Sequence, residues 1–284
     1  MVSTLIVLGV ALMLYPSAAQ WVSAWEQRGQ VQDYSDAIEE TPSEQLAEQL
    51  DRARTYNRDL ASGSGIIDPF SAEVVQENRF GVGEGGLYRE LLAGGPAGVM
   101  ARLSIPGIEI DLPVFHGTSE ATLRRGIGHL EGTALPVGGA GTHSVLTGHR
   151  GLHSAELFTH LDELGEGDAF SIEVFGENLS YEVIRTQVVE PHETESLYPE
   201  AGRDLLTLVT CTPLGLNTHR ILVTAERSSE AAPEAETAPW APRDLPMPWW
   251  ALILFGALLL QVIYLWRIKA KQVVGSQADL PPSH

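Results

Sequence analysis

The stretch Thr207–Arg220, TLVTCTPLGLNTHR, contains the only cysteine of the chain, Cys211. The apolar and β-branched residues Leu205–Thr210 predict a strand that leads to this cysteine, and His219–Thr224 predict a second strand. A turn rich in proline, glycine and asparagine separates the two strands. Neighbouring strands lie ~4.8 Å apart, so a loop of this length can bring the Cys211 thiol and the Arg220 guanidinium together.

A cation beside a thiol has a chemical consequence. It lowers the pKa of the thiol, and the thiolate is the reactive nucleophile. The pairing of Cys211 with Arg220 therefore predicts a reactive site. Two plainer interpretations stay open on these residues alone: Cys211 as a small buried apolar residue, and Arg220 as a solvated strand end.

The length and the net charge of the chain limit its possible domain count and partners. A chain of 284 residues holds one large or two small domains. Its formal net charge of −19 argues against a nucleic-acid partner. Histidines and carboxylates are not grouped at the spacing of metal ligands in the sequence, so we expect no metal and no other cofactor.

Two uncharged apolar stretches, residues 2–22 and 246–266, bracket the chain. Each is close to the ~20 residues that cross a bilayer. Tryptophans near the ends of the second stretch suit membrane interfaces, and the basic residues of Arg267–Lys271 follow at once. By the positive-inside rule we expect two membrane passes, with residues 23–245 outside the cytoplasm and residues 267–284 as a cytoplasmic tail.

The first apolar stretch has a rival interpretation. Ser17–Ala19 resembles a signal-peptide cleavage site, although no positive residues precede the apolar run. The run continues through Trp21 and Val22, which favours a retained anchor. In either case a single cysteine outside the cytoplasm is a liability unless it pairs with another chain or reacts. Export therefore favours a functional Cys211.

The part outside the cytoplasm divides into helical and strand-rich regions. Residues 23–33 predict a polar junction, and residues 34–60 an amphipathic helix with a start signal at Thr41–Ser43. From residue 87 to 227, short strands and turns predict a closed or nearly closed β-barrel, or a sandwich. Short helices are expected near Ser119–Arg124 and from Ser154 to Leu161. The other expected strands are Gly98–Ile105, Ile108–Leu112, Gly126–His129, Thr142–Thr147, Ala169–Phe175 and Leu179–Val189.

Two polar segments are predicted to lie outside any folded core. Residues 228–245 form a linker rich in proline, alanine and glutamate. Residues 272–284 form a polar tail that we expect to be disordered. Neither segment contains enough apolar residues to bury the surface that folding requires.

The stretch Thr207–Arg220 resembles the signature of the sortases, cysteine transpeptidases of the bacterial surface. Their pattern is TLxTC followed by an arginine at the start of the next strand, and Thr207–Cys211 and Arg220 match it. The longer run TCTPLGLNTHRILV is most similar to the pilus-building, class C branch. The resemblance implies a mainly β fold: a sortase-type closed β-barrel over residues 87–227 with short helices. It further implies an N-terminal helical and lid region over residues 23–86, and flanking transmembrane helices.

Class C sortases carry a lid with an Asp-Pro-aromatic motif ahead of the catalytic domain. Ile66–Phe70, IIDPF, resembles this motif, although from the residues alone it is a turn in which Pro69 sets φ. The resemblance implies that the Asp68 carboxylate pairs with Arg220 and that the Phe70 ring covers Cys211.

Nucleophilic cysteine catalysis also needs a proton donor for the leaving amine. Nine histidines compete for this role. His149 has a local argument, because it ends a predicted strand in a glycine-flanked turn, TGHRG, and His143 is its nearest competitor. The run HSVLTGHRGL resembles the segment that carries the sortase catalytic histidine, which implies that the role belongs to His149.

The resemblance implies transpeptidation. Cys211 attacks the Thr–Gly carbonyl of a Leu-Pro-x-Thr-Gly sorting signal, His149 protonates the leaving amine, and Arg220 holds the substrate and the oxyanion. In class C members a pilin lysine resolves the thioester, which polymerises the pilins. The expected partners are therefore pilin subunits with C-terminal sorting signals and the bacterial cell membrane, and the catalytic domain is expected to be monomeric.

Two alternatives remain. The first is a housekeeping sortase that attaches proteins to peptidoglycan, against which the lid motif and the second apolar stretch argue. The second is an inert, membrane-tethered β-barrel that only binds a partner.

Overall fold

The computed structural model describes residues 2–60, 85–229 and 247–278. The lid residues expected from the sequence, Asp68 and Phe70, lie outside the described residues. The chain separates into two compact units, of which one comprises residues 23–243 and the other the two terminal segments.

The terminal unit contains the first part of α1 (Val2–Glu40) and α6 (Trp249–Ala278). Both helices are long and apolar enough to cross a membrane. The Gln261 amide of α6 donates a hydrogen bond to the Thr4 hydroxyl of α1 at 3.3 Å. The two apolar stretches found in the sequence therefore lie side by side as helices.

The disorder predicted for residues 272–284 is wrong for the first part of that tail. Helix α6 continues through Ala278 instead of ending at the basic residues. Once a helix is nucleated, each further residue adds a hydrogen bond at little cost, and Gln272, Gln277 and Ala278 favour helix enough to offset Gly275.

The polar junction at residues 23–33 is helical, because α1 runs through it as one helix. The break comes later, at Thr41 and Pro42, before α2 (Ser43–Leu60). Thr41 was expected to cap the second helix, but its hydroxyl donates to the Ala37 carbonyl of α1 at 2.7 Å. A proline lacks the N–H that continues a helix, which explains why α1 ends here.

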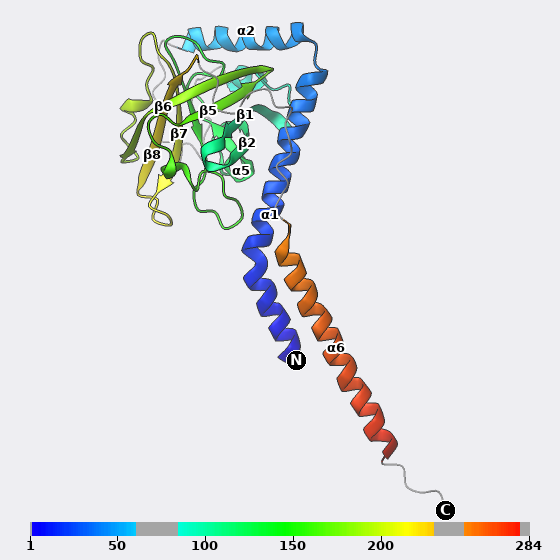
Figure 1. Ribbon diagram of the computed structural model, residues 1–284. Coiled ribbons are helices and arrows are strands. Elements are labelled where there is room, and N and C mark those ends of the chain that lie inside the picture. The colour runs from blue at the N-terminus through cyan, green and yellow to red at the C-terminus, as the bar shows by residue number, and fades with distance from the viewer. Residues whose placement is uncertain (1, 61–84, 230–246, 279–284) are drawn as a thin grey trace, which may run out of the picture. The chain divides into compact units, whose positions relative to one another are not determined.

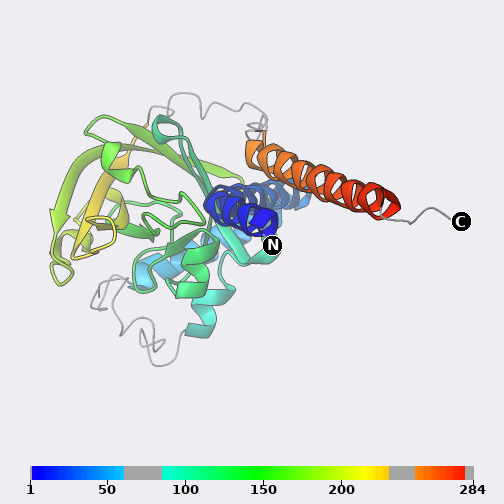
Figure 2. The same ribbon diagram turned by 90° about the horizontal axis from the view of Figure 1, so that it is seen from below.

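Eight strands close into a barrel in the order β1-β2-β3-β4-β7-β8-β6-β5. Figures 1 and 2 show the strand-rich part of the chain from two sides. The stretch Thr207–Arg220 runs from β7 into β8. These two strands pair antiparallel, and β4 lies parallel to β7 on its other side. The closed order confirms the barrel and excludes the sandwich. The strands are β1 (Val99–Ile105), β2 (Ile110–His116), β3 (Ile127–His129), β4 (Thr142–Thr147), β5 (Ala169–Val174), β6 (Glu177–Val189), β7 (Asp204–Thr212) and β8 (His219–Arg227).

Short helices and single 3₁₀ turns connect the strands. They are α4 (Gly85–Glu90), α5 (Glu120–Arg125), η1 (Pro96–Gly98), η2 (Pro106–Ile108), η3 (Leu161–Glu163) and η4 (Glu195–Leu197). The helix expected from Ser154 to Leu161 does not form. Instead, the segment forms single turns, and the Phe158 N–H donates to the His149 carbonyl at 3.0 Å, which ties it to the loop that follows β4.

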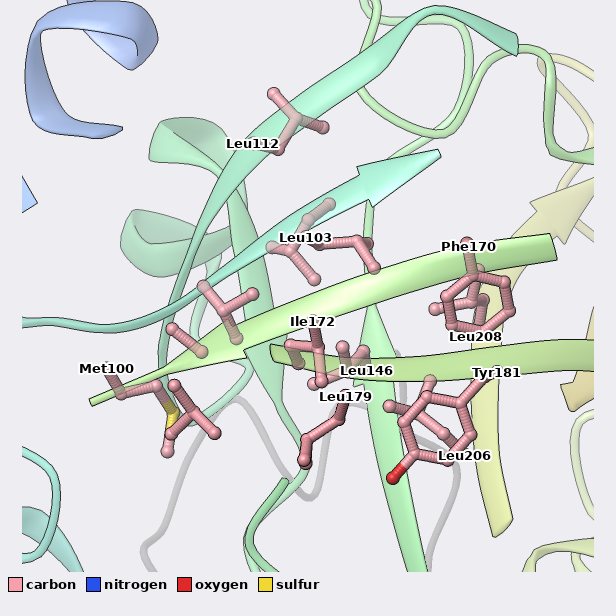
Figure 3. Packing of buried hydrophobic residues seen from close by; sticks show 14 of the residues in the cluster. Met100, Leu103, Leu112, Leu146, Phe170, Ile172, Leu179, Tyr181, Leu206 and Leu208 are labelled. Carbon is pink, nitrogen blue, oxygen red and sulfur yellow. The ribbon is translucent and has the colours of Figure 1, made fainter. Parts of the chain in front are cut away.

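The barrel interior determines which residues of β7 face outward. Leu206 and Leu208 of β7 point into the apolar interior, as does Phe170 of β5 (Figure 3). Successive side chains of a strand alternate between its two faces. Val209 and Cys211 therefore lie on the outer face of the barrel, away from the main core.

The helices on either side of the undescribed residues 61–84 attach to the turn that follows β3. In α2, the Asn57 side chain donates to the Leu135 carbonyl at 3.0 Å and accepts from its N–H at 2.7 Å. In α4, the Tyr88 hydroxyl lies 2.9 Å from Nδ1 of His129, whose Nε2 lies 2.8 Å from the Ala134 carbonyl. A carbonyl only accepts, so Nε2 of His129 carries a proton.

Acid should destabilise this arrangement. Burial lowers the pKa of His129 to about 4, from an ordinary value of 6.5. As the pH falls from 6.5 toward 4, the unfolded chain binds a proton that the folded chain does not, so stability present above pH 6.5 is lost. For this one group the loss by pH 4.5 is roughly 2 to 3 kcal/mol. Urea unfolding of the detergent-solubilised chain at pH 7 and pH 4.5 measures it.

The His129→Gln variant isolates this contribution, because an amide can still donate to Ala134 and accept from Tyr88. We expect the variant to lose less stability than the wild type over the same pH interval. Replacement of the exposed His192 serves as the control and should leave the pH dependence unchanged. An equal loss in the wild type and His129→Gln would contradict the prediction.

Candidate active site

Cys211 and Arg220 are direct cross-strand partners in the β7–β8 pair. The pairing of Cys211 with Arg220 on neighbouring strands, predicted from Thr207–Arg220, is thus confirmed. Cys211 is 7% exposed and Arg220 is 8% exposed, so the interpretation of Arg220 as a solvated strand end is wrong. The loop between the two strands contributes an acceptor for the Arg220 guanidinium, the Asn217 carbonyl.

That loop orients the guanidinium. Nη1 of Arg220 donates to the carbonyl of Asn217 at 2.9 Å and to that of His219 at 3.0 Å. Asn217 has a left-handed backbone with φ of 56°, which asparagine tolerates better than most residues. The turn chemistry noted in the sequence therefore positions the cation as well as reversing the chain.

His149 reaches the level of Cys211 from the other side of β7. The parallel pairing of β4 with β7 continues one step past the end of β4. There the Gly148 N–H donates to the Val209 carbonyl at 3.1 Å, and the Thr210 hydroxyl donates to the Gly148 carbonyl at 2.7 Å. Continued by this register, His149, in the loop just after β4, comes level with the Cys211–Arg220 pair.

The glycine before His149 is required by packing. A Cβ atom at Gly148 would lie 2.6 Å from the Phe158 ring and 2.8 Å from Ile127. Only a residue without a side chain lets the backbone approach these groups so closely. This contact explains the glycine of the TGH motif.

A carboxylate that the sequence did not single out faces His149. Oε2 of Glu120, in the first turn of α5, lies 3.3 Å from Nε2 of the imidazole. A hydrogen bond from Arg124, with a smaller contribution from His149, lowers the pKa of Glu120 below its ordinary value. The ionised carboxylate only accepts hydrogen bonds, so it favours a proton on Nε2 of His149. No sequence motif marks Glu120.

The competing His143 occupies a different place. Its side chain is buried, with Nδ1 3.1 Å from the Tyr198 carbonyl and Nε2 2.7 Å from the Thr207 hydroxyl. Burial lowers the pKa of His143. Thr207 lies two outward-facing positions before Cys211 on β7, so both ring nitrogens are engaged away from the thiol.

The outer face between these polar groups carries a second, small apolar cluster. Val209 and Leu222 contribute to it from β7 and β8, directly next to the level of Cys211 and Arg220. Leu197 of η4 packs in the same cluster. Within the described ranges, His, Cys, Asp and Glu form no group of three or more that could hold a metal ion.

A thiol, an imidazole and a guanidinium at one level of a barrel are the groups that a cysteine acyl transferase needs for attack, proton transfer and oxyanion binding. The sortase domain family matches residues 103–228. The chain also shares 45% of its aligned residues with sortase C-1 of Actinomyces oris and covers 99% of that structure. The chain belongs to the sortase family, whose members are cysteine transpeptidases.

The structural matches extend beyond the barrel. The Actinomyces oris enzyme matches 66% of this chain with a TM-score of 0.61. Sortase C1 of GBS pilus island 1 matches 73% of it, and 94% of that structure is covered, at 36% identity and a TM-score of 0.64. Sortase D of Bacillus subtilis is 30% identical over 111 residues, which are 39% of this chain and 53% of that protein. The chain thus spans about half the length of this curated relative.

Proposed function

We propose that this chain is a membrane-anchored transpeptidase of the class C kind, which joins pilin subunits through their sorting signals. The arrangement of Cys211, His149 and Arg220 at one level supports the chemistry. Similarity to sortase C enzymes supports the substrate class. One of these enzymes is from a pilus island, and another was described in terms of its pilin substrate specificity.

In the first half-reaction the Cys211 thiolate attacks the carbonyl carbon of threonine in an LPxTG-like signal. The Arg220 guanidinium stabilises the oxyanion as the tetrahedral intermediate forms. The C–N bond to glycine then breaks, and the His149 imidazolium gives its proton to the leaving amine. The products are a thioester and a neutral imidazole.

In the second half-reaction a pilin lysine amine attacks the thioester. The neutral His149 takes the proton that the amine loses, and the C–S bond breaks to release the Cys211 thiolate. The new isopeptide bond links two pilins, and the enzyme returns to its starting protonation state. Glu120 is placed to accept a hydrogen bond from His149 in both half-reactions.

The proposed location is a bacterial cell membrane, crossed twice, with the catalytic domain outside the cytoplasm. The two long apolar helices support membrane anchoring. The basic residues at Arg267–Lys271 support a cytoplasmic C-terminus by the positive-inside rule. Substrates anchored in the same membrane would then meet the enzyme without diffusing in three dimensions.

Asp68 and Phe70 are proposed to restrict access to the thiol, on the strength of the sequence resemblance alone. Asp68→Ala or Phe70→Ala should then speed alkylation of Cys211 by iodoacetamide, by about tenfold for a closed population near 90%. Alkylation is followed by mass spectrometry of the intact chain in detergent. Equal rates in wild type and both variants would reject this role.

A trapping experiment tests the proposed function. The detergent-solubilised chain is incubated with an LPxTG peptide, and the acylated residue and the cleaved bond are identified by mass spectrometry. A second incubation offers a pilin lysine donor and a cell-wall amine in competition. We expect a thioester on Cys211 and transfer to the pilin lysine. Transfer only to the cell-wall amine would indicate a housekeeping sortase, and no acylation would indicate a binding module.

A further inference from the structure

The arginine that follows His149 makes contacts that the reaction described above does not use. The Arg150 side chain is only 9% exposed although it carries a full charge. Its Nε donates to the Thr159 carbonyl at 3.1 Å, its Nη1 donates to the Thr212 hydroxyl at 3.0 Å, and its Nη2 forms an ion pair with Asp162 at 2.5 Å. All three nitrogens of the guanidinium therefore have an acceptor.

These acceptors belong to two different parts of the candidate site. Thr212 directly follows Cys211 at the end of β7. Thr159 and Asp162 belong to the segment that folds back onto the histidine loop, where the Gly151 N–H also bonds the Thr159 hydroxyl at 3.2 Å. A single guanidinium thus connects the backbone that carries the thiol to the backbone that carries the imidazole.

We propose that Arg150 is a positioning residue that sets the distance and orientation of His149 relative to Cys211. The inference rests on the proposed catalytic roles of those two residues. Arg150 acts through the two loops and not on the substrate. A ~1 Å displacement of a catalytic group can cost a hundredfold in rate, so a rigid link between the loops has a measurable effect.

The chemistry of the link requires arginine. A planar guanidinium presents N–H groups in a fixed fork, and here they reach a carbonyl, a hydroxyl and a carboxylate at once. A lysine ammonium is a single point that can approach one of these acceptors closely but not all three. Asp162 balances the buried charge, so Arg150 is not an uncompensated cation beside the thiol.

The test uses alkylation of Cys211 by iodoacetamide, which needs no sorting signal and therefore reports on Arg150 independently of the proposed function. Arg150→Gln, Arg150→Lys and Thr212→Val are made in the full-length, detergent-solubilised chain. Each substitution is combined with both wild-type His149 and His149→Ala. With His149 present, we expect Arg150→Gln to slow alkylation at pH 7 by about tenfold. We expect Arg150→Lys to recover only part of this loss, and Thr212→Val to show a smaller one.

The His149→Ala background separates positioning from general destabilisation. If Arg150 acts only through His149, Arg150→Gln and Thr212→Val have no further effect once His149 has been replaced. The effects of the two substitutions in each double variant are then fully non-additive. Arg203→Gln is the matched control. Arg203 also bonds two partners, Glu200 and Glu226, but precedes β7 at its other end. It should change alkylation less than twofold.

Two results would overturn the proposal. One is an equal effect of Arg150→Gln in both backgrounds, or an effect no larger than that of Arg203→Gln. The other is an unchanged alkylation rate in Thr212→Val, which decides the matter if Arg150→Gln fails to fold. Failure of the wild type to form a thioester with a sorting peptide would overturn the proposed function, while the alkylation cycle would still decide the role of Arg150.

Discussion

Replacement of Cys211 by alanine is expected to abolish thioester formation and pilin polymerisation. The variant keeps the barrel, because the change removes a single sulfur atom at the end of β7, outside the clusters of buried apolar residues that form the core. Loss of a covalent nucleophile costs on the order of 10⁴-fold or more in rate, since no other group can form the acyl intermediate. The measurement is the amount of polymer and of trapped acyl-enzyme formed with a sorting-signal substrate.

The chain has no second cysteine to act as a matched control, so Cys211→Ser serves instead. Serine keeps the shape of the site and a hydroxyl, but a neutral hydroxyl is a far weaker nucleophile than a thiolate. Both variants should unfold at temperatures close to that of the wild type. Polymer formation by Cys211→Ala within tenfold of the wild-type rate would exclude the transpeptidase.

Replacement of Arg220 by lysine is expected to have the second largest effect. The guanidinium is buried and oriented by the carbonyls of Asn217 and His219. A lysine keeps the charge but cannot satisfy these carbonyls and also present a donor to an oxyanion. We expect kcat to fall by about 10² to 10³-fold, as for the loss of an oxyanion donor. Single-turnover acylation with a sorting peptide measures this change.

Arg227→Lys is the control for Arg220→Lys. Arg227 lies at the other end of β8, with its guanidinium 5.7 Å from the centre of the Tyr181 ring. It shares the strand and the residue type, but not the level of Cys211. We expect its kcat to stay within about twofold of the wild type. Similar losses in the two variants would mean that arginines of β8 act through stability, and would remove Arg220 from the chemistry.

Much of the fold could be predicted because its signals are local. The β7–β8 pair follows from two apolar runs separated by turn residues, so the opposition of Cys211 and Arg220 needs only the length of one loop. The two long apolar helices follow from composition. One error is the helix expected from Ser154 to Leu161, which does not form, and another is at the end of α6, which runs on to Ala278. There, continuation of a helix costs less than a break, and no local pattern reports this.

The rest of the candidate site could not be derived from residue patterns. From the residues themselves His149 was one of several candidates, and only the resemblance to sortases preferred it to His143. Glu120 and Arg150 carried no signal. Their partners His149, Thr212 and Asp162 lie on other elements or in turns whose backbone bonds were not predictable.

The sequence alone determined which reactive and apolar groups the chain contains. They are one thiol, an arginine opposite it, and apolar segments near both ends of the given sequence. The tertiary structure decided which histidine comes level with Cys211, and which charged side chain bonds to both loops. The reason is that β4 and β7 pair in parallel although many residues separate them in the chain. Such a pairing is selected by closure and burial of the whole barrel, not by any short stretch.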